Sequence, residues 1–334
     1  MIHVKKTMMA LGLAVLFLLV VAACGTEQHE GTAKQPNTDP GETVGEGAKQ
    51  PEIDETAKTI VHHMGETIVE GEPKQIASLF PRFTDFLLAL EITPIAVSTA
   101  GPDAEEFTWY YADQLEGTTS VGWFTEPNFE ALLQAEPDLI LGLPNLDQVY
   151  SSLEKIAPTI LLDVVETEEG IKDWRQTFIE TAGIIGEEEK AEQVIASYDQ
   201  QVEEAKQEIE RAIGQESVMF LRVTDKELRY YGQKNFDVLY GDLALQPPVD
   251  FPGNEDTFAP ISLEILPEID PDHIFLLSDQ EENLELVEGN SIWENLTAVR
   301  EGNVYQVDYE LWFQGFGPIG SSLIVEDAVE KLTK

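Results

Sequence analysis

The sequence predicts an α/β protein made of two similar lobes joined by one long helix. Three observations support this prediction: short apolar runs alternate with helical patterns, one long helical pattern lies near the middle of the chain, and a helix–turn–strand unit occurs twice. Alternating strands and helices are typical of parallel α/β units.

The N-terminus has the features of an export signal. Lys5 and Lys6 supply a basic segment, an apolar run extends from Met8 to Ala23, and small residues precede Cys24. The run is shorter than the roughly 20 residues that a membrane-spanning helix needs. We therefore expect residues 1–23 to be a signal peptide.

Cys24 is the only cysteine of the 334 residues. Val21-Ala22-Ala23-Cys24 resembles the lipobox of bacterial lipoproteins, which implies cleavage before Cys24 and diacylation of its thiol. Two or three acyl chains hold a protein on a membrane, whereas one holds it only marginally. The alternative is an ordinary secretory signal followed by an incidental cysteine. With Cys24 used as an anchor, the folded body has no thiol for disulfides, metal or catalysis.

Residues 24–55 are rich in Gly, Thr, Glu, Gln and Pro and nearly lack large apolar side chains. Such a segment cannot bury enough surface to order itself, so we expect a flexible tether. The folded body is therefore expected to begin near Thr56.

The chain is strongly acidic, with 63 Asp and Glu against 20 Lys and Arg and a formal net charge of −43. A surface of this charge repels nucleic acid and anionic lipid, which argues against both as partners. Most of the acids fall on predicted helices, where they form a solvated face.

The body begins with strand-like runs separated by helical patterns. IASLF, PIAVS, LILGL and TILLDV predict buried strands, FTDFLLALEI, FEALLQAE and QVYSSLEKIA predict helices, and SVMFLRV, DHIFLL and NVYQVD resume the strand pattern. Between these sets, residues 187–214 hold no proline and no internal glycine, and apolar residues recur at helical spacing. A helix of this length would be about 40 Å long. It is expected to join an N-terminal lobe at 56–186 to a C-terminal lobe at 215–334.

A helix–turn–strand unit is repeated in the two halves. FEALLQAEPDLILGL (129–143) and LEILPEIDPDHIFLL (263–277) align without a gap. Glu130 aligns with Glu264, and the acid–Pro–Asp turn at 136–138 aligns with the turn at 270–272. The repeat indicates two lobes of similar architecture. Chance similarity between amphipathic segments is the alternative, which the matched turn weakens.

Catalytic and metal-binding motifs are scarce. The body lacks G-x-S-x-G, H-E-x-x-H and C-x-x-C, and its only histidines are His62, His63 and His273. His62 and His63 are adjacent, and adjacent residues of a strand point to opposite faces. GFGPIG (315–320) matches the dinucleotide pattern, but too few residues follow it for a βαβ unit. We predict a protein that is not an enzyme, with a nucleotide-dependent enzyme as the remote alternative.

Residues 56–334 resemble the siderophore- and cobalamin-binding class (class III) of substrate-binding proteins of ABC importers. The stretches that carry the resemblance are MGETIVEGEPKQIASLFPRFTDFLLALEI, SVGWFTEPNFEALLQAEPDLIL, YSSLEKIAPTI, ISLEILPEIDPDHIF and SIWENLTAVREGNVYQVDYELWFQGFGPIGSSLIVEDAVEKL. VMFLRVTDKELRYYGQKNF is similar to the Gram-positive iron(III)-siderophore branch. Two departures are Gln75 and Glu91; Glu91 replaces a glycine after the first helix and is expected to make a less favourable turn.

The resemblance implies two Rossmann-like lobes, one rigid inter-lobe helix and a ligand cleft between the lobes. It also implies that iron is bound only as its siderophore complex, so we expect no cofactor and no direct metal site. The expected partners are the siderophore and the ABC permease subunits. We expect a monomer anchored through Cys24 on the extracellular face of the cytoplasmic membrane.

Two arginines occupy equivalent positions in the predicted lobes. Arg82 follows the first strand, where doubly wound folds open their crevice, and Arg222 ends the first strand of the second lobe. Guanidinium groups suit carboxylate or hydroxamate oxygens, and aromatic rings suit the faces of an organic shell. The alternatives are local salt bridges for the arginines and core packing for the aromatics. The candidate ligand-binding residues are Arg82, Trp123, Phe124, Arg222, Tyr231, Trp312 and Phe313.

The charge of the predicted cleft bears on the ligand. Two arginines on a very acidic body favour a neutral or modestly anionic complex, such as a ferric hydroxamate or citrate-hydroxamate. A triscatecholate carries about three negative charges and would need a more basic cleft. Ferric citrate, a ferric catecholate, haem and cobalamin remain alternatives, and the sequence does not name the molecule.

In members of this class, one surface carboxylate per lobe pairs with permease arginines. The resemblance places these acids at Asp85 in PRFTDFLLAL and at Glu264 in ISLEIL. Both are expected in a first helical turn, where a carboxylate also favours the helix dipole, so a helix-capping role is the alternative.

Overall fold

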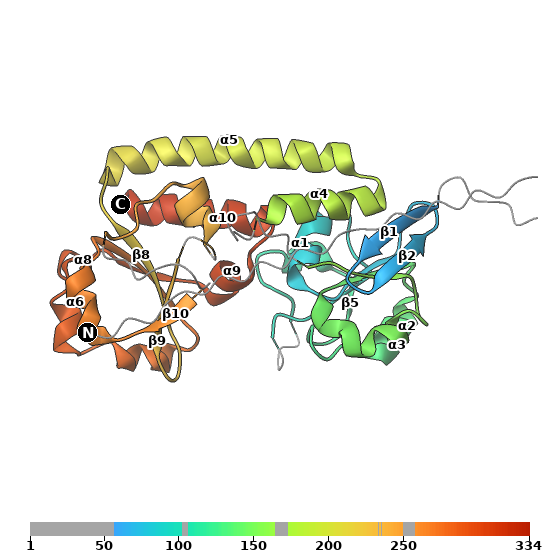
Figure 1. Ribbon diagram of the computed structural model, residues 1–334, viewed down its shortest axis with the longest axis horizontal. Helices are drawn as coiled ribbons and strands as arrows, with labels where there is room; N and C mark the ends of the chain where they lie inside the picture. Colours follow the sequence, from blue (N-terminus) through green and yellow to red (C-terminus); the bar gives the residue numbers. More distant parts are fainter. Residues whose placement is uncertain (1–56, 102–105, 164–172, 233, 235, 250–257) are drawn as a thin grey trace, which may run out of the picture. The chain divides into compact units, whose positions relative to one another are not determined.

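The computed structural model describes residues 57–101, 106–163, 173–232, 234, 236–249 and 258–334. These residues form two five-stranded sheets, a two-stranded hairpin and the helices around them (Figure 1). The predicted signal peptide (1–23), the tether (24–55) and Cys24 lie outside the described residues. None of the described helices combines the length and the apolar character needed to cross a membrane.

The first sheet is entirely parallel, and its strands lie side by side in the order third, second, first, fourth, fifth along the chain. The order reverses between the first and fourth strands, which is where a doubly wound sheet opens its crevice. The hairpin β1 (Lys58–His62) and β2 (Gly65–Val69) precedes this sheet. Its strands are β3 (Ile76–Ser78), β4 (Ala96–Val97), β5 (Thr119–Ser120), β6 (Leu139–Gly142) and β7 (Thr159–Leu161), and its helices are α1 (Pro81–Ala89), α2 (Phe129–Ala135), α3 (Tyr150–Leu153) and α4 (Trp174–Ile185).

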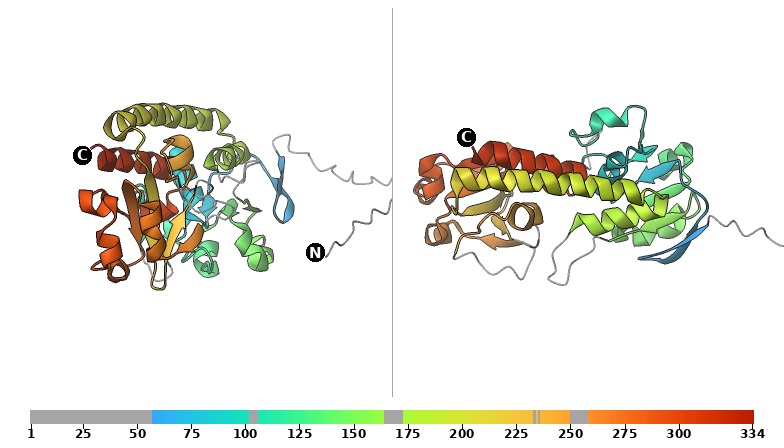
Figure 2. Two further views of the ribbon diagram at one scale, coloured as in Figure 1. Left: turned by 60° about the vertical axis from the view of Figure 1, so that its left-hand side comes forward. Right: turned by 90° about the horizontal axis from the view of Figure 1, so that it is seen from above.

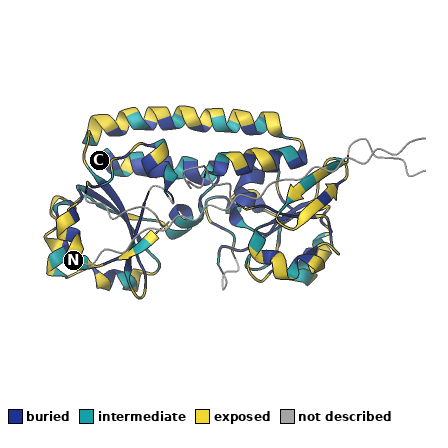
Figure 3. Cartoon of the chain, in the orientation of Figure 1, coloured by how far each residue is buried: buried dark blue, intermediate teal, exposed yellow. Residues whose placement is uncertain are grey.

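The second sheet repeats this spatial order, although its second strand along the chain runs antiparallel to the other four. The long apolar runs predicted as strands are almost completely buried, as the dark blue strands of Figure 3 show. The strands are β8 (Val218–Val223), β9 (Leu228–Tyr231), β10 (Phe258–Ile261), β11 (His273–Ser278) and β12 (Val304–Val307), and the helices are α6 (Leu266–Ile269), α7 (Ser291–Glu294), α8 (Thr297–Glu301), α9 (Tyr309–Gln314) and α10 (Pro318–Leu332).

The long helix predicted at 187–214 is α5 (Glu188–Ile213). It begins just after Gly186, which ends α4 in the left-handed region, and it ends at Gly214. One apolar face of α5 is buried against α4 and α10 (Figures 1 and 2), while its acidic residues face away from the core. The helix therefore packs against a helix that precedes it and against the last helix of the chain.

The repeated unit folds in the same way in both halves. Glu136 and Asp270 both end their helices in the left-handed region, with φ of 52° and 38°. Asp138 then accepts hydrogen bonds from the backbone N–H groups of Lys74 and Gln75, just before β3. Asp272 accepts in the same way from Ser217, just before β8. Each turn thus fixes the start of the central strand of its own sheet, which explains the matched Asp.

The departure at Glu91 has the predicted consequence. Glu91 follows α1 with φ of 63°. Glycine adopts this left-handed conformation freely, but among L-residues mainly asparagine and aspartate adopt it. The N–H of Ile92 closes the turn on the carbonyl of Leu87 at 2.8 Å, and Glu91 forms an ion pair with Lys190 of α5. The helix end keeps its geometry without the glycine.

Candidate functional site

The site begins where β3 passes into α1. Phe80 is the extended residue before the helix, and Pro81 is its first residue, a position where the missing proline N–H costs nothing. Arg82 therefore lies in the first turn of α1, at the carboxyl end of the central strand. Only 9% of its surface is exposed.

A cavity of about 190 Å³, here called the aromatic cavity, opens beside Arg82. Residues from the β3–α1 junction and from the loop after β5 form one side, and residues in and just after α9 form the other. The cavity is mostly apolar, with Arg82 as its charged group. Its lining residues are Phe80, Pro81, Arg82, Trp123, Phe124, Tyr309, Phe313, Gln314 and Phe316.

The loop after β5 presents two predicted aromatics to this cavity. Trp123 and Phe124 follow Gly122, whose φ of 77° turns the chain, and their ring centroids lie 4.2 Å apart. Phe124 also meets Phe80 edge-on at 5.1 Å. Edge-to-face contacts of this kind hold aromatic walls in defined positions.

Polar contacts hold α9 beside the opposite wall. Asp308 caps α9 through the N–H of Leu311 at 2.8 Å and also accepts a hydrogen bond from the indole N–H of Trp109 at 2.8 Å. The side-chain amide of Gln314 donates to the carbonyl of Ala100 at 3.1 Å, whereas its oxygen, at the cavity, has no partner among the described residues. These bonds tie α9 to the chain segment between β4 and β5.

Arg82 is buried without a hydrogen-bonding partner for two of its nitrogens. Nε and Nη1 reach no acceptor within the part of the chain that the structure describes. Burial lowers the pKa of Arg82 to about 10, and Asp85 and Asp163 only partly oppose that effect. The guanidinium lies 5.8 Å from the ring centroid of Phe316. A buried charge without acceptors is unfavourable, so this position favours a ligand that supplies them.

Arg222, the equivalent arginine of the second sheet, is fully paired. Its Nε and Nη2 donate to the two carboxylate oxygens of Asp279 at 2.6 and 3.0 Å, and its Nη1 donates to the hydroxyl of Tyr231 at 3.2 Å. Burial opposes its charge, but these hydrogen bonds outweigh burial and raise its pKa. The guanidinium stacks 4.0 Å from the ring centroid of Phe313. Arg222 and Tyr231 therefore lie behind the wall of the aromatic cavity rather than in it.

The prediction that Trp312 binds ligand is wrong. Trp312 is completely buried, stacks parallel to Phe220 at 5.9 Å and packs on Phe275 of β11. Its indole N–H donates to Asp327 of α10 at 2.8 Å. Trp312 is a core residue, because the inward face of α9 covers the second sheet.

The prediction that Asp85 is a surface docking acid is also wrong. Asp85 has no exposed surface, and it lies in the middle of α1 rather than in its first turn. Its carboxylate accepts hydrogen bonds from the backbone N–H groups of Ile319 and Gly320, at 2.9 and 2.8 Å, in the first turn of α10. A Cβ at Gly317 would lie 2.5 Å from this carboxyl group, so only glycine fits there. Burial raises the pKa of Asp85 to about 7, against these hydrogen bonds and the hydroxyl of Tyr110.

Glu264 is exposed at the first turn that follows β10, as expected. Ser262 caps this turn by accepting from the N–H of Glu264. Glu130, its partner in the repeat, is also exposed in a first turn, and Asn128 caps it in the same way at 3.1 Å. Glu130 therefore occupies in the first repeated unit the place that Glu264 occupies in the second.

The sequence prediction missed five residues of the aromatic cavity: Phe80, Pro81, Tyr309, Gln314 and Phe316. Phe316 belongs to GFGPIG, which forms the tight loop between α9 and α10 and so does not follow a strand, as the dinucleotide pattern requires. Phe80 could have been predicted, because it lies just after the first strand of the sheet and two residues before Arg82. Among the described residues, no group of three or more His, Cys, Asp or Glu could hold a metal ion.

Comparisons with known proteins show which family the chain resembles. Residues 76–311 match the family model of the periplasmic binding proteins. The probable siderophore-binding lipoprotein YfiY of Bacillus subtilis (strain 168) is 25% identical over 339 residues, which cover 97% of each chain. The iron(3+)-hydroxamate-binding protein FhuD of the same strain is 27% identical over 348 residues, which cover 100% of each chain.

A solved structure gives the same fold. Staphylococcus aureus SirA complexed with staphyloferrin B is 25% identical, with a TM-score of 0.70 over 82% of this chain and 98% of that one. The predicted two-lobed α/β architecture is thereby confirmed, and the family match confirms a binding protein rather than an enzyme. The chain belongs to the periplasmic binding protein family.

Proposed function

We propose that the chain is the substrate-binding component of an ABC importer and that it captures an iron(III)-siderophore. The observation that carries this proposal is the aromatic cavity with one buried guanidinium at its edge, two of whose nitrogens have no acceptor among the described residues. Aromatic walls suit the organic shell of a chelate, and the guanidinium suits its oxygen atoms. Relatives named for siderophore and hydroxamate binding support the same ligand class.

The size of the cavity sets a condition on binding. Pockets for drug-sized ligands commonly have about 300–1,000 Å³, whereas the aromatic cavity has about 190 Å³. An iron chelate therefore requires the two walls to separate from their positions in this structure. The hydrogen bonds of Trp109 and Gln314 to the opposite wall are the contacts that would have to change.

The test is a tryptophan-fluorescence titration with ferrichrome, ferrioxamine B, ferric schizokinen, ferric citrate, a ferric catecholate, haem and cobalamin. Trp123 lines the cavity, so a bound ferric complex should quench its emission. We expect submicromolar affinity for a hydroxamate or citrate-hydroxamate complex. Preference for the catecholate would contradict the ligand class, and binding of none of the ferric complexes would contradict the function.

The proposal extends to the membrane. Lipid attachment at Cys24 would keep a monomeric binding protein on the extracellular face of the cytoplasmic membrane, beside its permease; the related lipoprotein supports this location. Glu264 and Glu130 are the proposed docking acids, since both are exposed at capped first turns of the repeated unit. A rim charge of this kind governs recognition of a partner more than ligand affinity.

A further inference from the structure

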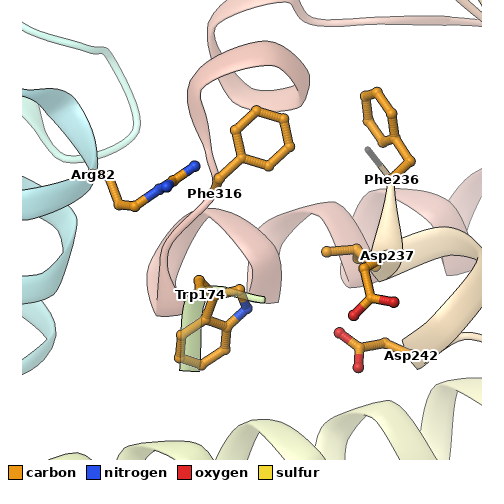
Figure 4. Close-up of a pocket in the computed structure, with 7 residues that line it drawn as sticks. Arg82, Trp174, Phe236, Asp237, Asp242 and Phe316 are labelled. Atoms are coloured by element: carbon orange, nitrogen blue, oxygen red, sulfur yellow. The ribbon is translucent and has the colours of Figure 1, made fainter. Parts of the chain in front are cut away.

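A second, smaller cavity lies behind Arg82. It has about 50 Å³ and is here called the inner chamber (Figure 4). Arg82 and Phe316 line both the inner chamber and the aromatic cavity, so the two spaces adjoin at these side chains. The inner chamber is lined by Arg82, Trp174, Phe236, Asp237, Val238, Asp242 and Phe316.

Two buried donors line the inner chamber without acceptors. They are the guanidinium of Arg82, through Nε and Nη1, and the indole Nε1 of Trp174. These residues are only 9% and 5% exposed. By contrast, the indole N–H groups of Trp109 and Trp312 both donate to carboxylates at 2.8 Å. A buried donor left unpaired is unfavourable, and more so when it is charged, so the chamber favours a ligand atom that accepts hydrogen bonds.

The carboxylates of the chamber do not satisfy these donors. Asp242 accepts from Arg175 at 2.8 Å and from the hydroxyl of Tyr198 at 2.7 Å, so both of its oxygens are bonded. No hydrogen bond from the described residues reaches Asp237, and burial raises the pKa of this carboxyl group to about 6. The carboxylate of Asp242 is thus bonded to other residues, and the carboxylate of Asp237 has no donor among the described residues.

We propose that the inner chamber is a carboxylate subsite, in which Arg82 and the indole N–H of Trp174 bind a carboxylate that projects from the iron chelate. This inference rests on the proposed function, because the chelate itself would occupy the aromatic cavity. A space of about 50 Å³ admits a carboxylate or a few waters but no chelated iron. An ammonium group would leave both donors unpaired and would lie beside a guanidinium.

The proposal selects among the ligand classes. Arg222 is bonded to Asp279 and Tyr231 and lines neither cavity, whereas Arg82 lines both and has two nitrogens without an acceptor among the described residues. One unpaired guanidinium matches one pendant carboxylate. Complexes with such a group are therefore preferred to trishydroxamates without one.

The test uses three complexes with the same iron centre: ferrioxamine B, its N-acetyl derivative and its N-succinyl derivative. They end in an ammonium, a neutral amide and a carboxylate. A hydrogen bond to a charged group is worth about 1.5–3 kcal/mol, so we expect the succinyl complex to bind about tenfold to a hundredfold more tightly than the acetyl complex. The ammonium complex should bind most weakly.

Variants assign the preference to the chamber. Arg82→Gln should abolish it, Trp174→Phe should reduce it, and Asp237→Asn should increase it by removing the repelling carboxylate. Trp293→Phe is the matched control, because Trp293 packs in the core of the second sheet and lines neither cavity, and it should keep the preference. Equal affinity for the three complexes, or preference for the ammonium, would overturn the proposal while leaving the siderophore function intact.

A second measurement needs no iron ligand. In the protein labelled with ¹⁵N-tryptophan, titration with acetate should shift the indole resonance of Trp174, assigned from Trp174→Phe, with an affinity in the millimolar range. Arg82→Gln should remove the shift, and acetamide should not produce it. A Trp174 resonance that ignores acetate would overturn the subsite. A shift without any ferrioxamine binding would support the subsite and count against the hydroxamate ligand class.

Discussion

Arg82 and Arg222 occupy equivalent places in the two sheets and have opposite environments. Each lies at the carboxyl end of the central strand of its sheet. Arg222 forms a bidentate pair with Asp279, which raises its pKa, whereas two nitrogens of Arg82 have no acceptor and burial lowers its pKa. The environment of Arg222 is typical of a structural ion pair within one lobe. The environment of Arg82 is typical of a residue whose hydrogen bonds are supplied by a ligand.

The acid nearest Arg82 in sequence sharpens this comparison. Asp85 follows Arg82 by three residues, but its two oxygens accept from the backbone of α10. Asp85→Ala would leave two buried N–H groups without partners, so we expect a loss of about 2–5 kcal/mol in the free energy of unfolding. Chemical denaturation measures this; a loss below about 1 kcal/mol would contradict the assigned role.

Asp85 should also make stability depend on pH. Its pKa in the folded protein, about 7, lies above its unfolded value, so its contribution is complete below about pH 4 and is lost as the pH rises through 7. The free energy of unfolding should therefore fall between about pH 4 and pH 7, by up to about 1.4 kcal/mol per unit, and level off above pH 7. Asp85→Asn should remove this part of the pH dependence; identical profiles for the two proteins would contradict it.

Removal of Arg222 tests the other side of the comparison. Arg222→Ala removes the pair with Asp279 and the stacking on Phe313, so we expect a loss of about 1–3 kcal/mol in the free energy of unfolding. Ligand affinity should fall much less, because Arg222 lies behind the cavity wall. Fluorescence titration of the folded variant measures this. A variant of normal stability that no longer binds ligand would show that Arg222 contacts the ligand directly.

The repeat offers a comparison between the lobes at their outer surfaces. The double variant Glu130→Ala, Glu264→Ala should lower uptake in cells severalfold and leave siderophore affinity unchanged, because a rim charge acts on permease recognition. Each single variant should have a smaller effect. The matched control is the double variant Glu136→Ala, Glu268→Ala, which removes two exposed acids that follow Glu130 and Glu264 by a few residues in the same repeated units. Normal transport by the first double variant would place the docking surface elsewhere.

The smallest expected effect is the change in stability when the left-handed residue of either repeated turn, Glu136 or Asp270, is replaced by glycine. Glu136 makes no side-chain hydrogen bond among the described residues, whereas Asp270 accepts from the N–H and the hydroxyl of Thr297 at 2.8 and 2.7 Å. Glu136→Gly should therefore stabilise the protein by about 0.5–1 kcal/mol, because glycine adopts positive φ without strain. Asp270→Gly should not, since it loses the bonds to Thr297. Thermal unfolding of both variants checks this.

The fold was predictable because its signals are local. Buried strands and the long helix follow from apolar spacing, and the repeated turn follows from Pro and Asp at matched positions. The role of that Asp, which holds the start of the central strand, needed the structure because its partners at Lys74 and Gln75 lie more than 60 residues away.

The site was predictable only in part, because which partner a side chain meets depends on distant segments. Arg82, Trp123, Phe124 and Phe313 do line the aromatic cavity. Trp312 and Phe313 are adjacent in α9, but the helix turns one toward the core and the other toward the cavity. No local pattern shows that Asp85 meets α10 more than 230 residues later, or that Asp279 pairs with Arg222.

The most direct test of the account compares wild type with Arg82→Gln in two measurements on the same samples: titration with the tightest-binding ferric complex of the panel, and thermal unfolding without ligand. If the ligand accepts the free hydrogen bonds of Arg82, the variant should bind the complex at least about tenfold more weakly. Without ligand it should unfold at the same or a higher temperature, because a buried charge with unpaired donors has been removed. A variant that keeps full affinity, or one that unfolds at a clearly lower temperature, would show that Arg82 is a structural residue like Arg222.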